Sequence, residues 1–161
     1  SFKCQSLVEI GPGLGRTLLN SYKSGAICSG LDIPLSIVGQ ALFFSEACGE
    51  NIFILPGEKA SETQLNDKIS LYVPSQAKEC IRKHALVMNI DSLTEIDSDT
   101  ARHYVSLIKK NSKLFYSVNH ERNKFTISEL FEAINTPPIF RTMSHWNGYV
   151  EEIYTNFADQ N

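Results

Sequence analysis

The chain has 161 residues, of which 42% are hydrophobic and 20% are charged. This composition suits one globular domain with its own core and excludes a disordered chain. Fifteen Lys and Arg against eighteen Asp and Glu give a formal net charge of −3, which argues against a nucleic-acid binder. We expect no membrane span, because no apolar run approaches roughly 18 residues, and the sequence shows no signal-peptide pattern.

The cysteines bear on the cellular compartment of the protein, and the first residue bears on whether the chain is a fragment. Cys4, Cys28, Cys48 and Cys80 never form a CxxC pair, and three of them lie in or beside apolar segments. We therefore expect reduced, mostly structural thiols and a cytoplasmic protein. The chain opens at Ser1 without a methionine and reaches a strand-like segment within a few residues. This suggests a fragment truncated at its N-terminus, whose missing region could carry part of the function.

Predicted strands and helices alternate along the chain. Apolar runs bounded by turn residues predict strands over 6–10, 26–32, 51–55, 68–73, 84–90, 114–118, 139–143 and 149–154. Periodicity and end signals predict helices over 17–24, 34–48, 76–83, from about 98 through 108, and from 126 to 135. The polar stretch 56–67 is expected to be a loop.

Several details of these helices can be tested. Leu35, Val38 and Leu42 share one apolar face of the helix over 34–48. Ser75 is expected to cap the helix over 76–83. Asp97 or Ser98 is expected to cap the helix that follows.

Alternation of strands and helices implies crossover connections and a mainly parallel sheet. The predicted fold is therefore α/β, with a doubly wound, Rossmann-like sheet and helices on both faces. Ligands of such folds bind beyond the carboxyl ends of the strands. The polar residues expected there are the glycine loop 11–15, Asp32, Ser75, Asp91 and His120.

The strongest functional signal is the segment EIGPGLG at 9–15. Glycines at a strand-to-helix turn permit positive φ angles and close approach of a ligand to the main chain, and the next helix adds amide donors. The glycine spacing is G-x-G-x-G, whereas a dinucleotide fingerprint reads G-x-G-x-x-G. A phosphate-binding P-loop would need Gly-Lys-Ser/Thr, but Arg16 follows Gly15.

A carboxylate follows the next predicted strand. Asp32 lies 17 positions after Gly15 and could accept both hydroxyls of a ribose. The alternative is that Asp32 only begins the next helix, just ahead of Pro34. The preceding glycine loop favours the ribose interpretation.

These residues resemble a known family. EIGPGLG followed by a strand ending in Asp32 resembles motif I and the post-I acid of class I S-adenosylmethionine-dependent methyltransferases. The segments LDIP, YVPSQ, NIDSLTEI and LFYSVNHE look like the sugar O-methyltransferases of bacterial polysaccharide gene clusters, and together they cover most of the chain. The resemblance implies S-adenosyl-L-methionine as cofactor and a sugar, nucleotide-sugar or other small hydroxyl compound as methyl acceptor.

The same resemblance implies roles for individual residues. Gly11, Gly13 and Gly15 would lie against the cofactor, with Glu9 orienting its methionine part and Asp32 holding the ribose. Asp91 and Ser92 would lie near the methyl donor and the acceptor. Many relatives place an acid that reads the adenine after their third strand; here that position falls on Glu58 or Ser75, and the sequence does not decide between them.

Methyl transfer to an alcohol needs a general base or a metal. His120, just after the strand over 114–118, is the first candidate base, although it could instead be a solvated loop residue. Asp91 is the second candidate, as base or as metal ligand. No structural zinc site is expected, because His84, His103 and His145 do not have ligand spacing.

Two other classes of function remain open. An NAD-dependent oxidoreductase or epimerase would also use Asp32, but the glycine spacing and the missing Tyr-x-x-x-Lys pair argue against it. The third possibility is a non-catalytic methyltransferase-like domain kept for binding. We expect a small-molecule partner, no nucleic acid and no membrane; the oligomeric state is not predicted.

Overall fold

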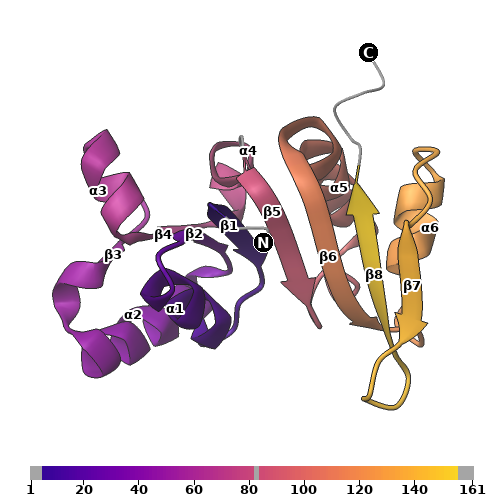
Figure 1. The fold of residues 1–161 in the computed structure, drawn as a ribbon, viewed down its shortest axis with the longest axis horizontal. Coiled ribbons are helices and arrows are strands. Elements are labelled where there is room, and N and C mark those ends of the chain that lie inside the picture. The colour runs from indigo at the N-terminus through magenta and orange to yellow at the C-terminus, as the bar shows by residue number, and fades with distance from the viewer. Residues whose placement is uncertain (1–4, 82–83, 156–161) are drawn as a thin grey trace. The chain divides into compact units, whose positions relative to one another are not determined.

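The computed structural model describes residues 5–81 and 84–155 (Figure 1). Cys4 lies outside the described residues. The chain divides into two compact units, Ser1–Cys80 and Ile81–Asn161, and each is described by itself below. The prediction of one cofactor-binding domain over 1–161 stays a prediction.

The first unit is a parallel α/β layer. Its described strands are β1 (Ser6–Ile10), β2 (Ile27–Leu31), β3 (Phe53–Ile54) and β4 (Ile69–Tyr72). They pair in the order β3-β4-β2-β1, and every pair is parallel. The connecting helices are α1 (Arg16–Lys23), α2 (Pro34–Cys48), α3 (Glu62–Asp67) and α4 (Ala77–Cys80), with short 3-10 turns η1 (Glu50–Ile52) and η2 (Pro74–Gln76). Parallel pairing brings the carboxyl ends of these strands to one edge.

The second unit combines a parallel pair with an antiparallel hairpin. Strand β5 (His84–Ile90) runs parallel to β6 (Ser112–His120), and β6 pairs antiparallel with β8 (Tyr149–Thr155). Strand β7 (Phe140–Met143) completes the order β5-β6-β8-β7. Helices α5 (Ser98–Asn111) and α6 (Ile127–Glu132) follow β5 and β6.

Each unit has its own apolar core. In the first, Leu18 of α1, Phe44 of α2 and the strand residues Val8 and Ile69 are fully buried. In the second, the ring centroid of Phe131 lies 4.0 Å from the ring centroid of Tyr154 and 5.2 Å from that of Phe115. Burial of such aromatic side chains is a large part of the stability of a small unit.

The structure confirms most predicted elements. The helix over 34–48 and the strands over 6–10 and 84–90 have the predicted bounds. Asp97 caps α5 by accepting a hydrogen bond from the Thr100 amide at 2.9 Å. Thr126 and Glu129 form the predicted capping box of α6, which ends at Glu132 rather than at 135. The α/β class with a mainly parallel, Rossmann-like arrangement is confirmed.

The predictions for residues 56–67 and for Ser75 are wrong. The polar stretch 56–67 contains α3. Ser61 and Gln64 form a capping box at the N-terminus of this helix. Ser75 is not a helix cap: it lies inside the 3-10 turn η2, and the Gln76 side chain accepts from the Val73 amide at 3.2 Å. Residues 82–83 of the helix predicted over 76–83 lie outside the described residues.

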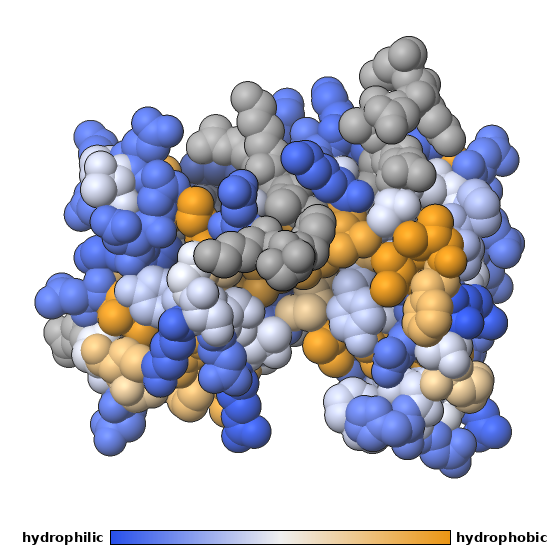
Figure 2. Space-filling model, viewed as in Figure 1, coloured by the Kyte–Doolittle hydropathy of each residue, from blue (hydrophilic) through white to orange (hydrophobic). Residues whose placement is uncertain are grey.

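The apolar face that periodicity selects on α2 faces solvent. Leu35, Val38 and Leu42 are 79%, 57% and 69% exposed. Apolar side chains accordingly appear at the surface over this helix (Figure 2). The buried face instead carries Ile37, Gln40 and Phe44, and Gln40 and Phe44 contact the glycine loop.

Candidate functional site

The glycine loop joins β1 to α1 in the first unit. Gly11, Gly13 and Gly15 have φ angles of 67°, 57° and 78°, a region that glycine adopts without steric cost. The turn is closed by the Gly11 amide, which donates to the Leu31 carbonyl, and by the Gly15 amide, which donates to the Pro12 carbonyl, both at 2.8 Å. The main chain therefore has one defined path over the end of β1.

The glycines of this loop differ in what surrounds them. A Cβ atom added at Gly13 would meet nothing within 4 Å, whereas one at Gly15 would lie 2.6 Å from Cζ of Phe44. Gly15 is thus required by packing against α2. Gly13 instead presents bare main chain to open space, where a ligand could approach.

Asp32 follows β2 and lies against this loop. Its carboxylate accepts hydrogen bonds from the Gly13 amide at 3.2 Å, the Ile33 amide at 2.8 Å and Nε2 of Gln40 at 3.1 Å. Burial raises the pKa of the Asp32 carboxyl above its ordinary value, and these bonds, with one from Ser36, oppose the rise. Asp32 both precedes α2 and contacts the glycine turn, so neither interpretation from the sequence excludes the other.

Glu9, two residues before Gly11, is buried beneath the loop. It is 3% exposed, and one of its oxygens, Oε2, has no hydrogen-bond partner. Burial raises the pKa of Glu9 from 4.5 to about 7; the charge of Asp32 adds to the rise, and a hydrogen bond with Thr17 opposes it.

Gln40 of α2 is a candidate site residue that the sequence did not predict. It is fully buried, and its Nε2 donates to the Gly13 carbonyl at 2.9 Å as well as to Asp32. This side chain joins the loop to the carboxylate. The glutamine lies among apolar residues of a predicted helix, so only its polarity within that helix could have drawn attention to it.

The two candidates for reading adenine follow different strands. Strand β4 is the direct neighbour of β2, and the Asp32 amide donates to the Tyr72 carbonyl at 3.1 Å. Ser75 follows β4, while Glu58 follows β3, one strand farther from Asp32. The Glu58 carboxylate accepts from the Leu55 amide at 2.9 Å, and Glu58 lines a cavity of about 280 Å³.

In the second unit, Asp91 and Ser92 follow β5. Asp91 has a φ of 53°, a strained value for a non-glycine residue. Its carboxylate accepts a hydrogen bond from the Tyr149 hydroxyl at 2.9 Å. The Ser92 hydroxyl accepts a hydrogen bond from Nδ2 of the buried Asn89 side chain. Oδ1 of the same side chain accepts a hydrogen bond from Nδ2 of Asn119 at 2.7 Å. This buried network holds the chain at the end of β5.

His120 ends β6 and lies opposite Tyr149 of β8. The two rings meet edge to face at 4.9 Å. Nδ1 of His120 accepts a hydrogen bond from the Arg122 amide at 3.0 Å, so in the neutral ring the proton lies on Nε2. Tyr149 therefore contacts both predicted catalytic residues, Asp91 and His120, and was missed because its position depends on strand pairing.

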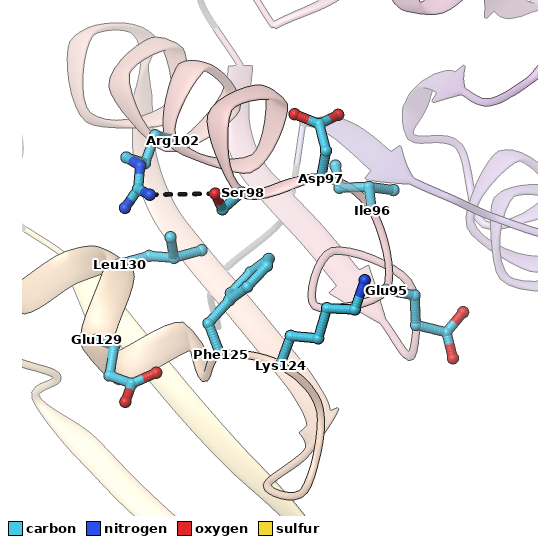
Figure 3. A pocket seen from close by; sticks show the side chains of 9 residues that line it. All are labelled: Glu95, Ile96, Asp97, Ser98, Arg102, Lys124, Phe125, Glu129 and Leu130. Atoms are coloured by element: carbon cyan, nitrogen blue, oxygen red, sulfur yellow. Dashed lines mark hydrogen bonds between the residues drawn. The ribbon is translucent and has the colours of Figure 1, made fainter.

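The second unit has a cavity of about 650 Å³, and none of the predicted site residues line it (Figure 3). It lies between the segments that follow β5 and β6, with Phe125 and Leu130 among its apolar residues. Of its three acidic residues, Glu95, Asp97 and Glu129, the last two already accept main-chain hydrogen bonds at the starts of α5 and α6. Arg102 donates to Ser98 at 3.1 Å (Figure 3).

No group of three or more His, Cys, Asp or Glu in residues 5–81 and 84–155 is arranged to hold a metal ion. Across the same residues, no helix has the length and apolar character to cross a membrane.

Comparison with known proteins identifies the fold. No protein-family model matches the chain, and no curated protein matches it. Among solved structures, the magnesium protoporphyrin IX methyltransferase of Synechocystis PCC 6803 with bound SAM superposes with a TM-score of 0.60 at 15% identity, over 92% of this chain and 67% of that chain.

Two further structures extend this comparison. The mitomycin 7-O-methyltransferase MmcR has a TM-score of 0.65 at 12% identity, over 95% of this chain and 49% of that chain. The methyltransferase domain of bacterial CtHen1-CN has a TM-score of 0.63 at 12% identity, over 95% of this chain and 91% of that chain. The fold of this chain is therefore the Rossmann-like fold of class I methyltransferases. At these identities the likeness establishes the fold alone.

Proposed function

We propose that the chain, acting as one cofactor-binding domain, binds S-adenosyl-L-methionine and methylates a hydroxyl of a small acceptor such as a sugar or nucleotide-sugar. The observation that carries the proposal is the contact between Asp32 and the open glycine turn at Gly13. Bare main chain beside a carboxylate suits a ligand that carries a ribose. A fold neighbour crystallised with SAM bound supports this choice of cofactor.

The buried oxygens near the turn also fit this cofactor. Glu9 Oε2 and Gln40 Oε1 have no hydrogen-bond donor, and the amino group of a methionine moiety would supply one. The proposed cofactor-binding residues are Glu9, Gly11, Gly13, Gly15, Asp32 and Ser92. When bound, S-adenosylmethionine supplies a methyl group on a sulfonium that a hydroxyl oxygen can attack.

The protein must then accept the proton of the hydroxyl group. Asp91 is exposed, and one of its carboxylate oxygens is already bonded to Tyr149, which leaves the other free to act as general base. Because Nδ1 of His120 accepts from a main-chain amide, the neutral ring presents a donor. The geometry thus favours Asp91 as the base and His120 as a donor that orients the acceptor.

Calorimetry with S-adenosylmethionine, S-adenosylhomocysteine and NAD tests the cofactor. Binding of the first two but not of NAD supports a methyltransferase. Binding of NAD alone would instead support the oxidoreductase, and no binding by a folded protein would support the non-catalytic domain. Asp32→Ala should weaken cofactor binding by about 1–3 kcal/mol, the range for lost charge-assisted hydrogen bonds; unchanged binding would remove Asp32 from the site.

Methyl transfer to a panel of sugars and nucleotide-sugars tests the reaction. Asp91→Asn should abolish turnover and keep cofactor affinity, and His120→Ala should reduce turnover less severely. Full turnover in Asp91→Asn would exclude that residue as the base. Transfer to none of these acceptors, together with transfer to an amine or thiol, would refute the hydroxyl assignment.

A further inference from the structure

Buried oxygen atoms without a donor gather at the glycine turn. Among the described residues three buried side-chain polar atoms lack a partner: Glu9 Oε2 and Gln40 Oε1 in the first unit, and the Tyr154 hydroxyl in the second. The orientation of the Gln40 amide is fixed, because its Nε2 donates both to the Gly13 carbonyl and to Asp32. Burying an acceptor without a donor costs free energy. A ligand that donates hydrogen bonds would therefore be stabilised in this region.

The same region holds two carboxyl groups and no paired cation. Glu9 is the fourth residue of β1, and Asp32 follows the neighbouring parallel strand β2. All ion pairs found in the described part of the chain lie in the second unit. Two carboxyl groups that interact in a buried place do not both ionise readily.

Of the two, Glu9 has the less favourable surroundings for a negative charge. Asp32 accepts three hydrogen bonds and is only half-buried, and these bonds offset part of the rise in its pKa that burial causes. Glu9 is almost fully buried and has the Thr17 hydroxyl of α1 as its hydrogen-bond partner. The groups that act on Glu9 are therefore Asp32 from β2, which disfavours its ionisation, and Thr17, which favours it; Gln40 from α2 is uncharged.

We infer that, at acidic pH, Glu9 is protonated in the ligand-free protein and releases this proton to solvent when it pairs with the ammonium group of the bound cofactor, so that cofactor binding weakens as the pH falls. The inference rests on the proposed function. Cofactor binding would then be coupled to the release of a proton, and Glu9 would lose its proton on binding only when the ligand carries a positive charge.

Burial raises the pKa of Glu9 to about 7, and this value sets how many protons are released on binding. Linkage then predicts release of about 0.9 proton per ligand at pH 6 and about 0.1 at pH 8. Below pH 7 the dissociation constant should rise about tenfold for each pH unit, since only the ionised form of Glu9 pairs with the ammonium.

The test is calorimetry with S-adenosylhomocysteine at pH 6 and pH 8, in buffers of different ionisation enthalpy, on the whole chain. The matched probe is 5′-methylthioadenosine, which keeps the adenosine but lacks the amino group. We expect proton release with the first ligand at pH 6 and none with the second. Glu9→Gln should abolish the release, and Glu46→Gln, on the exposed surface of α2, should leave it unchanged.

The possible failures are distinguishable. S-adenosylhomocysteine that binds with no proton release and a constant affinity from pH 6 to pH 8 would overturn this inference and leave the proposed cofactor intact. Equal proton release with both ligands would also overturn it, because the amino group would then not be the cause. No binding of S-adenosylhomocysteine at either pH would overturn the proposed function as well. The comparison of the two ligands needs no variant, so it holds even if Glu9→Gln does not fold.

Discussion

Glu9→Gln should make the protein more stable at alkaline pH. In the unfolded chain the carboxyl titrates at about 4.5, whereas burial beside Asp32 raises its pKa in the folded state to about 7. A carboxyl whose pKa rises on folding contributes stability that is complete below pH 4.5 and is lost as the pH rises through 7. At about 1.4 kcal/mol per pKa unit, the loss amounts to roughly 3 kcal/mol.

Urea unfolding of the wild type and of Glu9→Gln at pH 5, 6, 7 and 8 measures this difference. The two proteins should have similar free energies of unfolding at pH 5, and the variant should be more stable by about 2–3 kcal/mol at pH 8. Glu46→Gln, which changes an exposed carboxyl of α2, is the control and should follow the wild type. A variant that gains no stability relative to the wild type between pH 5 and pH 8 would refute the reasoning.

Three further predictions follow from packing and from the second unit. Gly15→Ala should lower the free energy of unfolding by roughly 1–3 kcal/mol, since its Cβ would lie 2.6 Å from Phe44; wild-type stability in urea would contradict this packing argument. Phe131→Ala should cost about 3–5 kcal/mol in the same assay, because the buried ring stacks on two others; a loss below 1 kcal/mol would show that the core tolerates the cavity. Tyr149→Phe, which removes the hydrogen bond to Asp91, should lower methyl-transfer turnover and leave calorimetric cofactor affinity unchanged; a changed affinity with full turnover would contradict a role in the reaction.

Local sequence signals were sufficient for much of the fold. The helix over 34–48 begins at a proline and ends at a glycine, and its bounds were predicted correctly. The strand over 84–90 was recognised as a continuous apolar run. Helix α3 was missed because it is short, polar and without a buried residue, although the capping-box pair Ser61 and Gln64 was readable in the sequence.

The candidate site was predicted in part. The glycine loop and Asp32 were found because their chemistry depends on spacing within a single β-α-β unit. Gln40 and Tyr149 were not found. Gln40 reaches Gly13 because α2 packs on the loop, and Tyr149 reaches His120 because β8 pairs antiparallel with β6.

The sequence by itself determined where most of the strands and helices lie, because caps, apolar runs and glycines act over a few residues. It also predicts the glycine loop over 11–15 as a place where a ligand can approach the main chain closely. Only the tertiary structure decided which face of α2 is buried: the periodic apolar face of Leu35, Val38 and Leu42 faces solvent, and Gln40 and Phe44 face inward. A helix with apolar residues on more than one side does not specify its own orientation, so the surface on which it packs makes the choice.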